Sequence, residues 1–206
     1  MIESGDYSNA INSFKKALHV IKGNATKRKT PLGADSSLAF RWSSINQLPA
    51  ERQIESVSGS FFVYRRALLI IPSDFLEGRI CLAETAAMLY NLSLSFHIEG
   101  YRSNNSTLLD KALKAYKIAL AICSCRRRKA CKKLQTDQLL YIAINNNMAM
   151  IHQEFMEFER ARICFISVSR ALRSLGNIGF LEQTEYQGLV LNLLMGRHEI
   201  TLAAAA

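Results

Sequence analysis

The sequence has few helix-breaking residues and no long apolar run. Only three prolines and ten glycines occur among 206 residues, and these two residue types are the ones that helix interiors tolerate least. No stretch approaches the roughly 18 apolar residues that a transmembrane helix requires. We therefore expect a mainly helical protein that has no membrane partner.

Signs of secretion are also missing. Met1–Asp6 carries neither the basic region nor the apolar region that begins a secretory leader. The five cysteines form an odd set, which favours free thiols in a reducing compartment over a disulfide framework. We expect an intracellular protein, in the cytoplasm rather than the nucleus.

Recognisable catalytic and metal-binding patterns are absent as well. The chain has no glycine-rich phosphate loop, no Gly-x-Ser-x-Gly turn and no His-Glu-x-x-His helix. Cys123, Cys125 and Cys131 do not follow the usual zinc pattern, in which cysteine pairs are two residues apart and four ligands are present. The four histidines are scattered along the chain as His19, His97, His152 and His198. We predict no enzymatic activity, no cofactor and no metal.

A rhythm of small, aromatic and small residues recurs along the chain. In its first copy, Ala10, Phe14 and Ala17 are spaced four and then three residues apart, so they share one helix face. The alanines allow a neighbouring helix to approach, and the aromatic ring fills the space between them. The rhythm returns as Ala112, Tyr116 and Ala119, and again as Ala161, Phe165 and Val168. Taken alone, it also fits three ordinary amphipathic helices.

Each later copy of the rhythm follows another helical pattern. Leu89–Gly100 precedes the second copy and Asn145–His152 precedes the third, while Gly5 allows a sharp turn before the first. Paired helices with this spacing resemble the tetratricopeptide repeat. The resemblance implies an all-α fold, a short solenoid of antiparallel helix-turn-helix units with roughly two and a half repeats over residues 1–22 and 85–196.

The chain departs from the family pattern in two respects. Ala112 and Ala161 are separated by more than the family's period of about 34 residues. We therefore expect an exposed loop insertion at Tyr101–Leu109, after a helix that ends at Gly100. The first repeat also lacks its first helix, which predicts either a longer protein upstream of Met1, the favoured alternative, or another element that covers this helix. The missing helix also leaves an apolar surface open to self-association.

The rest of the chain divides by composition. Residues 60–71 are rich in β-branched and aromatic side chains and precede Pro72, which predicts one or two short strands or an extended chain lying against the repeats. The last helix, Phe180–Gly196, is predicted to cap the open end of the stack. The expected domains are a partial repeat at 1–22, a linker with the extended segment at 23–72, repeats with the capping helix at 73–196 and a tail at 197–206.

The resemblance also implies a binding surface. In the family, the first helices of successive repeats line a concave groove, where an asparagine often hydrogen-bonds the backbone of a bound peptide; Asn91 and Asn147 occupy that position here. Neither Leu89–Ile98 nor Ile144–Glu154 holds a lysine or arginine, which predicts against recognition of a chaperone tail by its carboxylate. The implied groove residues are Tyr90, Asn91, Leu94, His97, Asn146, Asn147, Met150 and Gln153. We expect a protein–protein interaction scaffold that binds a partner peptide or protein in this groove.

A basic run indicates a different function. The formal net charge is +9, and the run lies between the two later repeats, where a turn is expected. It consists of Arg126, Arg127, Arg128, Lys129, Lys132 and Lys133. Three interpretations stay open: a solvated turn, a nuclear import signal together with Lys27–Lys29, or a site for nucleic acid or another anionic partner. The last of these is the alternative to the scaffold.

Salt separates the two functions. If the basic run binds phosphate groups, affinity for nucleic acid falls steeply as salt rises and disappears when its six basic residues are replaced by glutamine. Binding in a peptide groove survives salt and decreases in Tyr90→Ala or Asn147→Ala. Fluorescence anisotropy with DNA, RNA and peptides over a salt series measures both kinds of binding. Nucleic-acid affinity that is unchanged when the basic run is replaced contradicts the nucleic-acid function.

Overall fold

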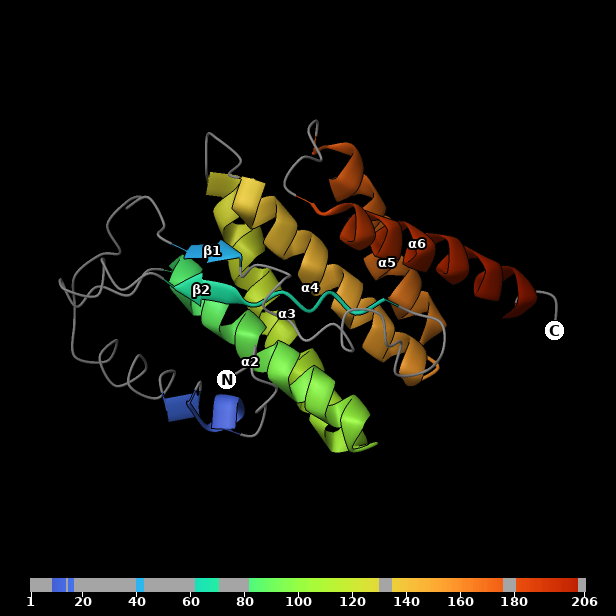
Figure 1. Ribbon diagram of the computed structural model, residues 1–206. Coiled ribbons are helices and arrows are strands. Elements are labelled where there is room, and N and C mark those ends of the chain that lie inside the picture. Colours follow the sequence, from blue (N-terminus) through green and yellow to red (C-terminus); the bar gives the residue numbers. More distant parts are fainter. Residues whose placement is uncertain are drawn as a thin grey trace. The chain divides into compact units, whose positions relative to one another are not determined.

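The computed structural model describes residues 9–13, 15–16, 40–42, 62–70, 82–129, 135–175 and 181–203. Its elements are β1 (Phe40–Trp42), β2 (Leu68–Ile70), α2 (Leu82–Arg102), α3 (Ser106–Lys129), α4 (Gln135–Glu154), α5 (Phe158–Arg173) and α6 (Gln183–Ala203) (Figure 1). Residues 9–13 and 15–16 are helical too. The described part of the chain is thus helical apart from one extended segment and two three-residue strands, which confirms the helical class.

The described residues fall into two compact units, divided after Arg65 and after Arg126. The first unit contains β1, residues 66–70, α2 and nearly all of α3. The second contains residues 62–65, α4, α5 and α6. None of the described helices is long and apolar enough to cross a membrane.

In the first unit, α2 and α3 form a hairpin with a short turn. Asn105 opens α3 as its N-cap, because its Oδ1 accepts hydrogen bonds from the amides of Thr107 and Leu108 at 3.0 and 3.3 Å. Asn104 takes a left-handed backbone with φ of 49°, which asparagine tolerates better than most residues. The loop insertion expected at Tyr101–Leu109 is therefore wrong: α2 runs to Arg102 and α3 begins at Ser106, so longer helices take up the extra residues.

Gly100 serves the packing of this hairpin rather than the end of α2. It is buried inside the helix, and a Cβ there would lie 2.8 Å from Leu109 Cδ2 and 3.1 Å from the Leu109 amide nitrogen. The prediction that Gly100 ends the helix is wrong, because the residue is needed where α3 begins to pack against α2.

The core of the hairpin is aromatic. Tyr116 of α3 is fully buried, with its ring centroid 6.1 Å from that of Tyr90 and 6.0 Å from that of His97, both on α2. Ala112 and Ala119 on either side of it are fully buried as well. The helix face predicted from this second copy of the rhythm is confirmed as a packing face.

In the second unit, α4 and α5 form another hairpin. Ala161, Phe165 and Val168 of α5 are buried, which confirms the face predicted from the third copy of the rhythm. At the open end of this hairpin, Gln138 Nε2 of α4 donates to the carbonyl oxygen of Ala171 at 3.1 Å.

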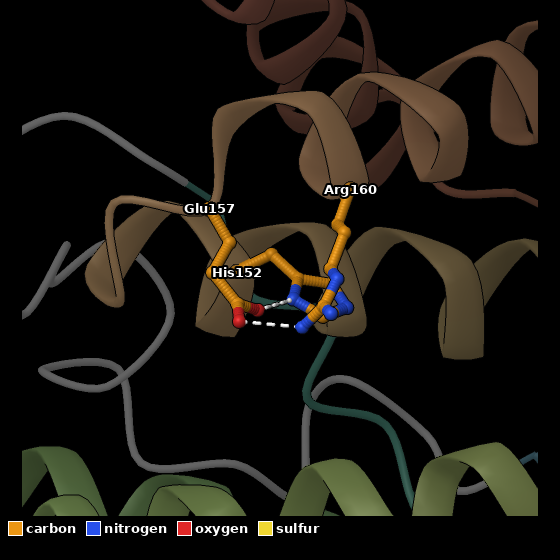
Figure 2. Close-up of polar contacts among 3 residues, drawn as sticks. All are labelled: His152, Glu157 and Arg160. Atoms are coloured by element: carbon orange, nitrogen blue, oxygen red, sulfur yellow. Dashed lines mark hydrogen bonds and ion pairs between the residues drawn. The ribbon is translucent and has the colours of Figure 1, made fainter.

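His152, Glu157 and Arg160 form a polar cluster that stabilises the turn between α4 and α5 (Figure 2). Glu157, just before α5, accepts from Arg160 Nη1 at 2.5 Å, and its other carboxylate oxygen lies 2.5 Å from Nδ1 of the buried His152. The Glu157 amide also donates to the carbonyl oxygen of His152 at 2.8 Å. These contacts hold the turn in place and give His152 a structural environment.

Helix α6 packs against α5 at a glycine. A Cβ on Gly196 would lie 2.6 Å from Cδ2 of Phe165, so the absence of a side chain there allows the two helices to meet. The helix continues to Ala203, past the boundary predicted at Gly196 and into the region predicted as a tail.

The extended segment predicted at 60–71 is confirmed over the residues that the structure describes. Residues 62–67 form neither a helix nor a paired strand and run as a long coil into β2 (Figure 1). Strand β2 pairs antiparallel with β1, with Phe40 opposite Ile70 and Trp42 opposite Leu68. The rest of the predicted linker lies outside the described residues. So do Phe14 and Ala17 of the first copy of the rhythm, whereas Ala10 is buried and Lys15 Nζ lies 5.4 Å from the centroid of the Phe96 ring.

The close approach at Gly100 has a measurable consequence. Alanine normally stabilises a helix interior by about 0.5–1 kcal/mol relative to glycine. Here we expect Gly100→Ala to lower the free energy of unfolding by about 1–3 kcal/mol, because the new methyl group overpacks against Leu109. Urea denaturation measures the change. Adding Leu109→Val to the Gly100→Ala variant is expected to restore part of the lost stability, because the smaller side chain relieves part of the overlap. A Gly100→Ala variant more stable than the parent contradicts the packing.

Candidate functional site

The extended segment is held by asparagine side chains that bind its main chain. In the first unit, Asn91 Nδ2 of α2 donates to the carbonyl oxygen of Leu68 at 2.7 Å, and the Leu68 amide donates to Asn91 Oδ1 at 2.9 Å. One side-chain amide thus satisfies both main-chain groups of one residue, as a neighbouring β-strand would. The Tyr90 hydroxyl donates to the carbonyl oxygen of Arg66 at 3.0 Å. We call Tyr90 and Asn91 the Leu68 site.

The second unit repeats this arrangement on α4. The Tyr64 amide donates to Asn147 Oδ1 at 2.8 Å, and Asn147 Nδ2 donates to the Tyr64 carbonyl oxygen at 2.9 Å. Both side chains are fully buried. Because a buried main-chain group without a hydrogen bond is costly, these two bonds allow an extended residue to lie against a helix.

Two further asparagines, Asn192 and Asn146, complete the second unit's site. The Phe62 amide donates to Asn192 Oδ1 at 2.7 Å, and Asn192 Nδ2 donates to the Phe62 carbonyl oxygen at 2.6 Å. Asn146 Nδ2 reaches the same carbonyl oxygen at 3.0 Å, and Asn146 Oδ1 accepts from Asn192 Nδ2 at 2.8 Å. We call Asn146, Asn147 and Asn192 the Tyr64–Phe62 site.

The bound main-chain groups follow the geometry of a strand. In an extended chain, successive residues direct their N–H and C=O groups to opposite sides, so alternate residues face the same way. The residues bound in the two sites are Phe62, Tyr64, Arg66 and Leu68, which are alternate along the segment. Within each unit, helix side chains therefore bind alternate residues of the chain, as the edge of a neighbouring strand would.

The predicted groove residues are thus occupied by the protein itself. All eight are buried, with exposed fractions of 9% or less, so none of them offers an open surface to a partner in this structure. Tyr90, Asn91, Asn146 and Asn147 bind the extended segment. Met150 accepts from Asn192 Nδ2 through its sulfur at 3.4 Å. His97 lies against the rings of Tyr101 and Tyr116 in the α2–α3 core, and Leu94 and Gln153 are buried in α2 and α4.

Sequence reasoning missed Asn192, because α6 was assigned only a capping role. The residue is fully buried and stands among the apolar residues Leu189, Leu191 and Leu194. A single amide within a leucine-rich stretch was a usable signal, since a buried amide needs hydrogen-bond partners.

Charge has little part in the two sites. The helix residues that bind the segment are asparagines and a tyrosine, and all are neutral. The first four residues of the basic run, Arg126–Lys129, belong to the end of α3 rather than to a turn between helices. Lys132 and Lys133 lie outside the described residues.

Other features of the described residues do not form a site. No group of His, Cys, Asp and Glu there could hold a metal ion. Cys123 and Cys164 are buried and Cys125 is exposed. On the exposed face of α5, a hydrogen bond from Arg162 lowers the pKa of the Glu159 carboxyl below its usual value. A hollow of about 300 Å³ between α5 and α6 is mainly apolar, with Phe165, Val190 and Leu193 among its lining residues.

Comparison with known proteins assigns no family to this arrangement. No protein-family model matches the chain, and neither the curated proteins nor the solved structures include a match.

Three successive asparagines provide a test of the site with an internal control. Asn147→Ala removes both hydrogen bonds to the Tyr64 main chain, and we expect it to lower the free energy of unfolding by about 2–4 kcal/mol. Asn145 instead donates to Tyr141 within its own helix, so Asn145→Ala is the matched control and costs about 1 kcal/mol. Urea denaturation gives both values, and equal losses in the two variants contradict the assigned role of Asn147.

Proposed function

We propose that this protein is a protein–protein interaction module of tetratricopeptide-like helical repeats that binds an extended partner segment by its main chain. Residues 62–68 occupy the two sites when no partner is bound, and a partner exchanges with them. The proposal rests on one observation: Asn91 and Asn147, from different hairpins, each bind the N–H and the C=O of a single extended residue.

Main-chain recognition suits an interaction module. Every protein segment carries the same N–H and C=O groups, so a side-chain amide that binds both selects for extended conformation and supplies affinity. Specificity then comes from the side chains beside the bound residue. The neutral sites fit a partner strand better than a nucleic acid, which requires cations and salt-sensitive contacts.

The helical framework supports the repeat interpretation. The hairpins α2–α3 and α4–α5 each present their asparagine from the first helix, while the second helix buries the small–aromatic–small face. In the resemblance drawn above, first helices line the binding surface and second helices support them. Helix α6 adds Asn192 to the surface and so takes part in binding as well as covering the end.

Residues 62–68 compete with an external partner for the two sites, so the partner must bind more favourably than this internal segment does. A tethered segment competes at a high effective concentration. The apparent affinity of a partner is then proportional to the fraction of sites that the segment leaves free. Weak binding by the intact chain is therefore expected, and it increases when the internal segment is weakened.

The test is exchange of the internal segment for an added one. In the full chain, residues 62–68 are replaced by glycine and serine, and a fluorescent peptide that copies residues 62–70 is titrated by anisotropy. We expect saturable binding that is at least tenfold tighter than to the parent chain, because the internal competitor is gone. The same substitution combined with Asn91→Ala and Asn147→Ala is the control for specific binding.

Two results contradict the proposal. One is the absence of peptide binding to a replaced chain that keeps its helical circular dichroism. The other is binding that survives both asparagine substitutions, since the peptide is then held elsewhere. The matched Asn145→Ala variant is expected to bind like the replaced chain itself, because Asn145 donates within α4.

A further inference from the structure

We infer that the second unit's site selects a partner segment with two neutral aromatic side chains two residues apart, the first lying on Gly188 of α6. This inference rests on the proposed function and specifies the partner that the Tyr64–Phe62 site accepts. It concerns side chains, whereas the proposed function concerns the main chain.

Gly188 forms the seat for the first aromatic ring. A Cβ built on Gly188 would overlap the Phe62 ring at Cγ, Cδ1 and Cδ2, so the ring lies directly on the backbone of α6. Glycine within a helix is otherwise unfavourable, and here its missing side chain leaves the volume that the ring occupies. Any other residue at position 188 would fill that seat.

The main-chain hydrogen bonds direct the ring to this seat. Asn192 is four residues after Gly188, so the two lie on the same face of α6, one turn apart. Asn192 holds both the N–H and the C=O of Phe62. With its main chain fixed at one turn of the helix, the residue places its ring over the neighbouring turn.

The second aromatic position is enclosed. Tyr64 is fully buried while its main chain is held by Asn147. Its ring meets that of Phe62 edge to face, with centroids 6.3 Å apart and an interplanar angle of 85°, an arrangement that aromatic pairs favour. Arg65, the next residue, is half-buried, and its side chain lies on the opposite side of the extended chain from that of Tyr64.

The neighbouring groups disfavour a charged residue most strongly at the second position, where Tyr64 is fully buried, whereas Phe62 is half-buried. Asn146, Asn147 and Asn192 are neutral and already bound to the main chain or to each other, and Gly188 offers no side chain. Burial of a charge without a partner is strongly unfavourable. The accepted segment is therefore extended and carries phenylalanine or tyrosine at both positions.

Peptide substitution tests this selection. The full chain with residues 62–68 replaced by glycine and serine is titrated with the 62–70 peptide and with copies that carry alanine at the position of Phe62, Tyr64 or Arg65. Each loss of an aromatic ring is expected to weaken binding tenfold or more, from the apolar surface no longer buried. Loss of the arginine changes affinity less than threefold. Equal affinities for all four peptides overturn the inference and leave the proposed function intact, whereas failure of every peptide to bind contradicts the proposed function itself.

The seat is tested on the protein side. Gly188→Ala in the replaced chain is expected to weaken the parent peptide about tenfold and to leave the peptide with alanine at position 62 unchanged, because only the ring meets the new methyl group. Unchanged binding of the parent peptide by a folded Gly188→Ala protein overturns the inference.

A measurement on the otherwise unmodified chain covers the case in which the replaced chain does not fold. Phe62→Ala and Tyr64→Ala are expected to speed hydrogen exchange of the main-chain amides at positions 62 and 64 at least tenfold more than Arg65→Ala does. Equal rates in the three variants overturn the inference.

Discussion

The pairing of asparagine side chains with an extended main chain is the interaction on which the described sites depend. In the described part of the chain, no strand pairs with residues 62–67, yet their buried N–H and C=O groups need hydrogen bonds. Asn147 binds Tyr64, Asn192 and Asn146 bind Phe62, and the Tyr90 hydroxyl binds the Arg66 carbonyl oxygen. Asn91 does the same for Leu68, the first residue of β2. This device lets helices bind a strand without themselves forming a sheet.

Glycine provides the second constraint, because close approach requires the absence of a side chain. At Gly100 it admits Leu109 between the helices of one hairpin, at Gly196 it admits Phe165, and at Gly188 it admits the Phe62 ring. The first two contacts join helices, and the third joins a helix to the extended segment. The absence of a side chain is therefore needed both for helix–helix packing and for the contact between α6 and the extended segment.

Periodic features were predictable from the residues alone. The buried faces around Tyr116 and Phe165 and the strand within residues 60–71 follow from spacing and residue type. Asn91 and Asn147 were singled out only by the resemblance to a repeat family. The ends of the helices were less predictable. Gly100 lies inside α2 because its close contact with Leu109 outweighs the tendency of glycine to end a helix. Asn192 escaped notice because its partner, Phe62, is far away in sequence.

The sequence by itself determined the helical class and the packing faces, because these depend on local periodicity and on side-chain chemistry. It also showed where asparagines stand on the helices. Only the tertiary structure decided what lies against those residues. Asn91 binds Leu68 and Asn147 binds Tyr64, and such pairings arise when chain folding brings distant residues together. A local pattern can mark an amide as available for a bound main chain, but the three-dimensional path of the chain decides whose main chain it binds.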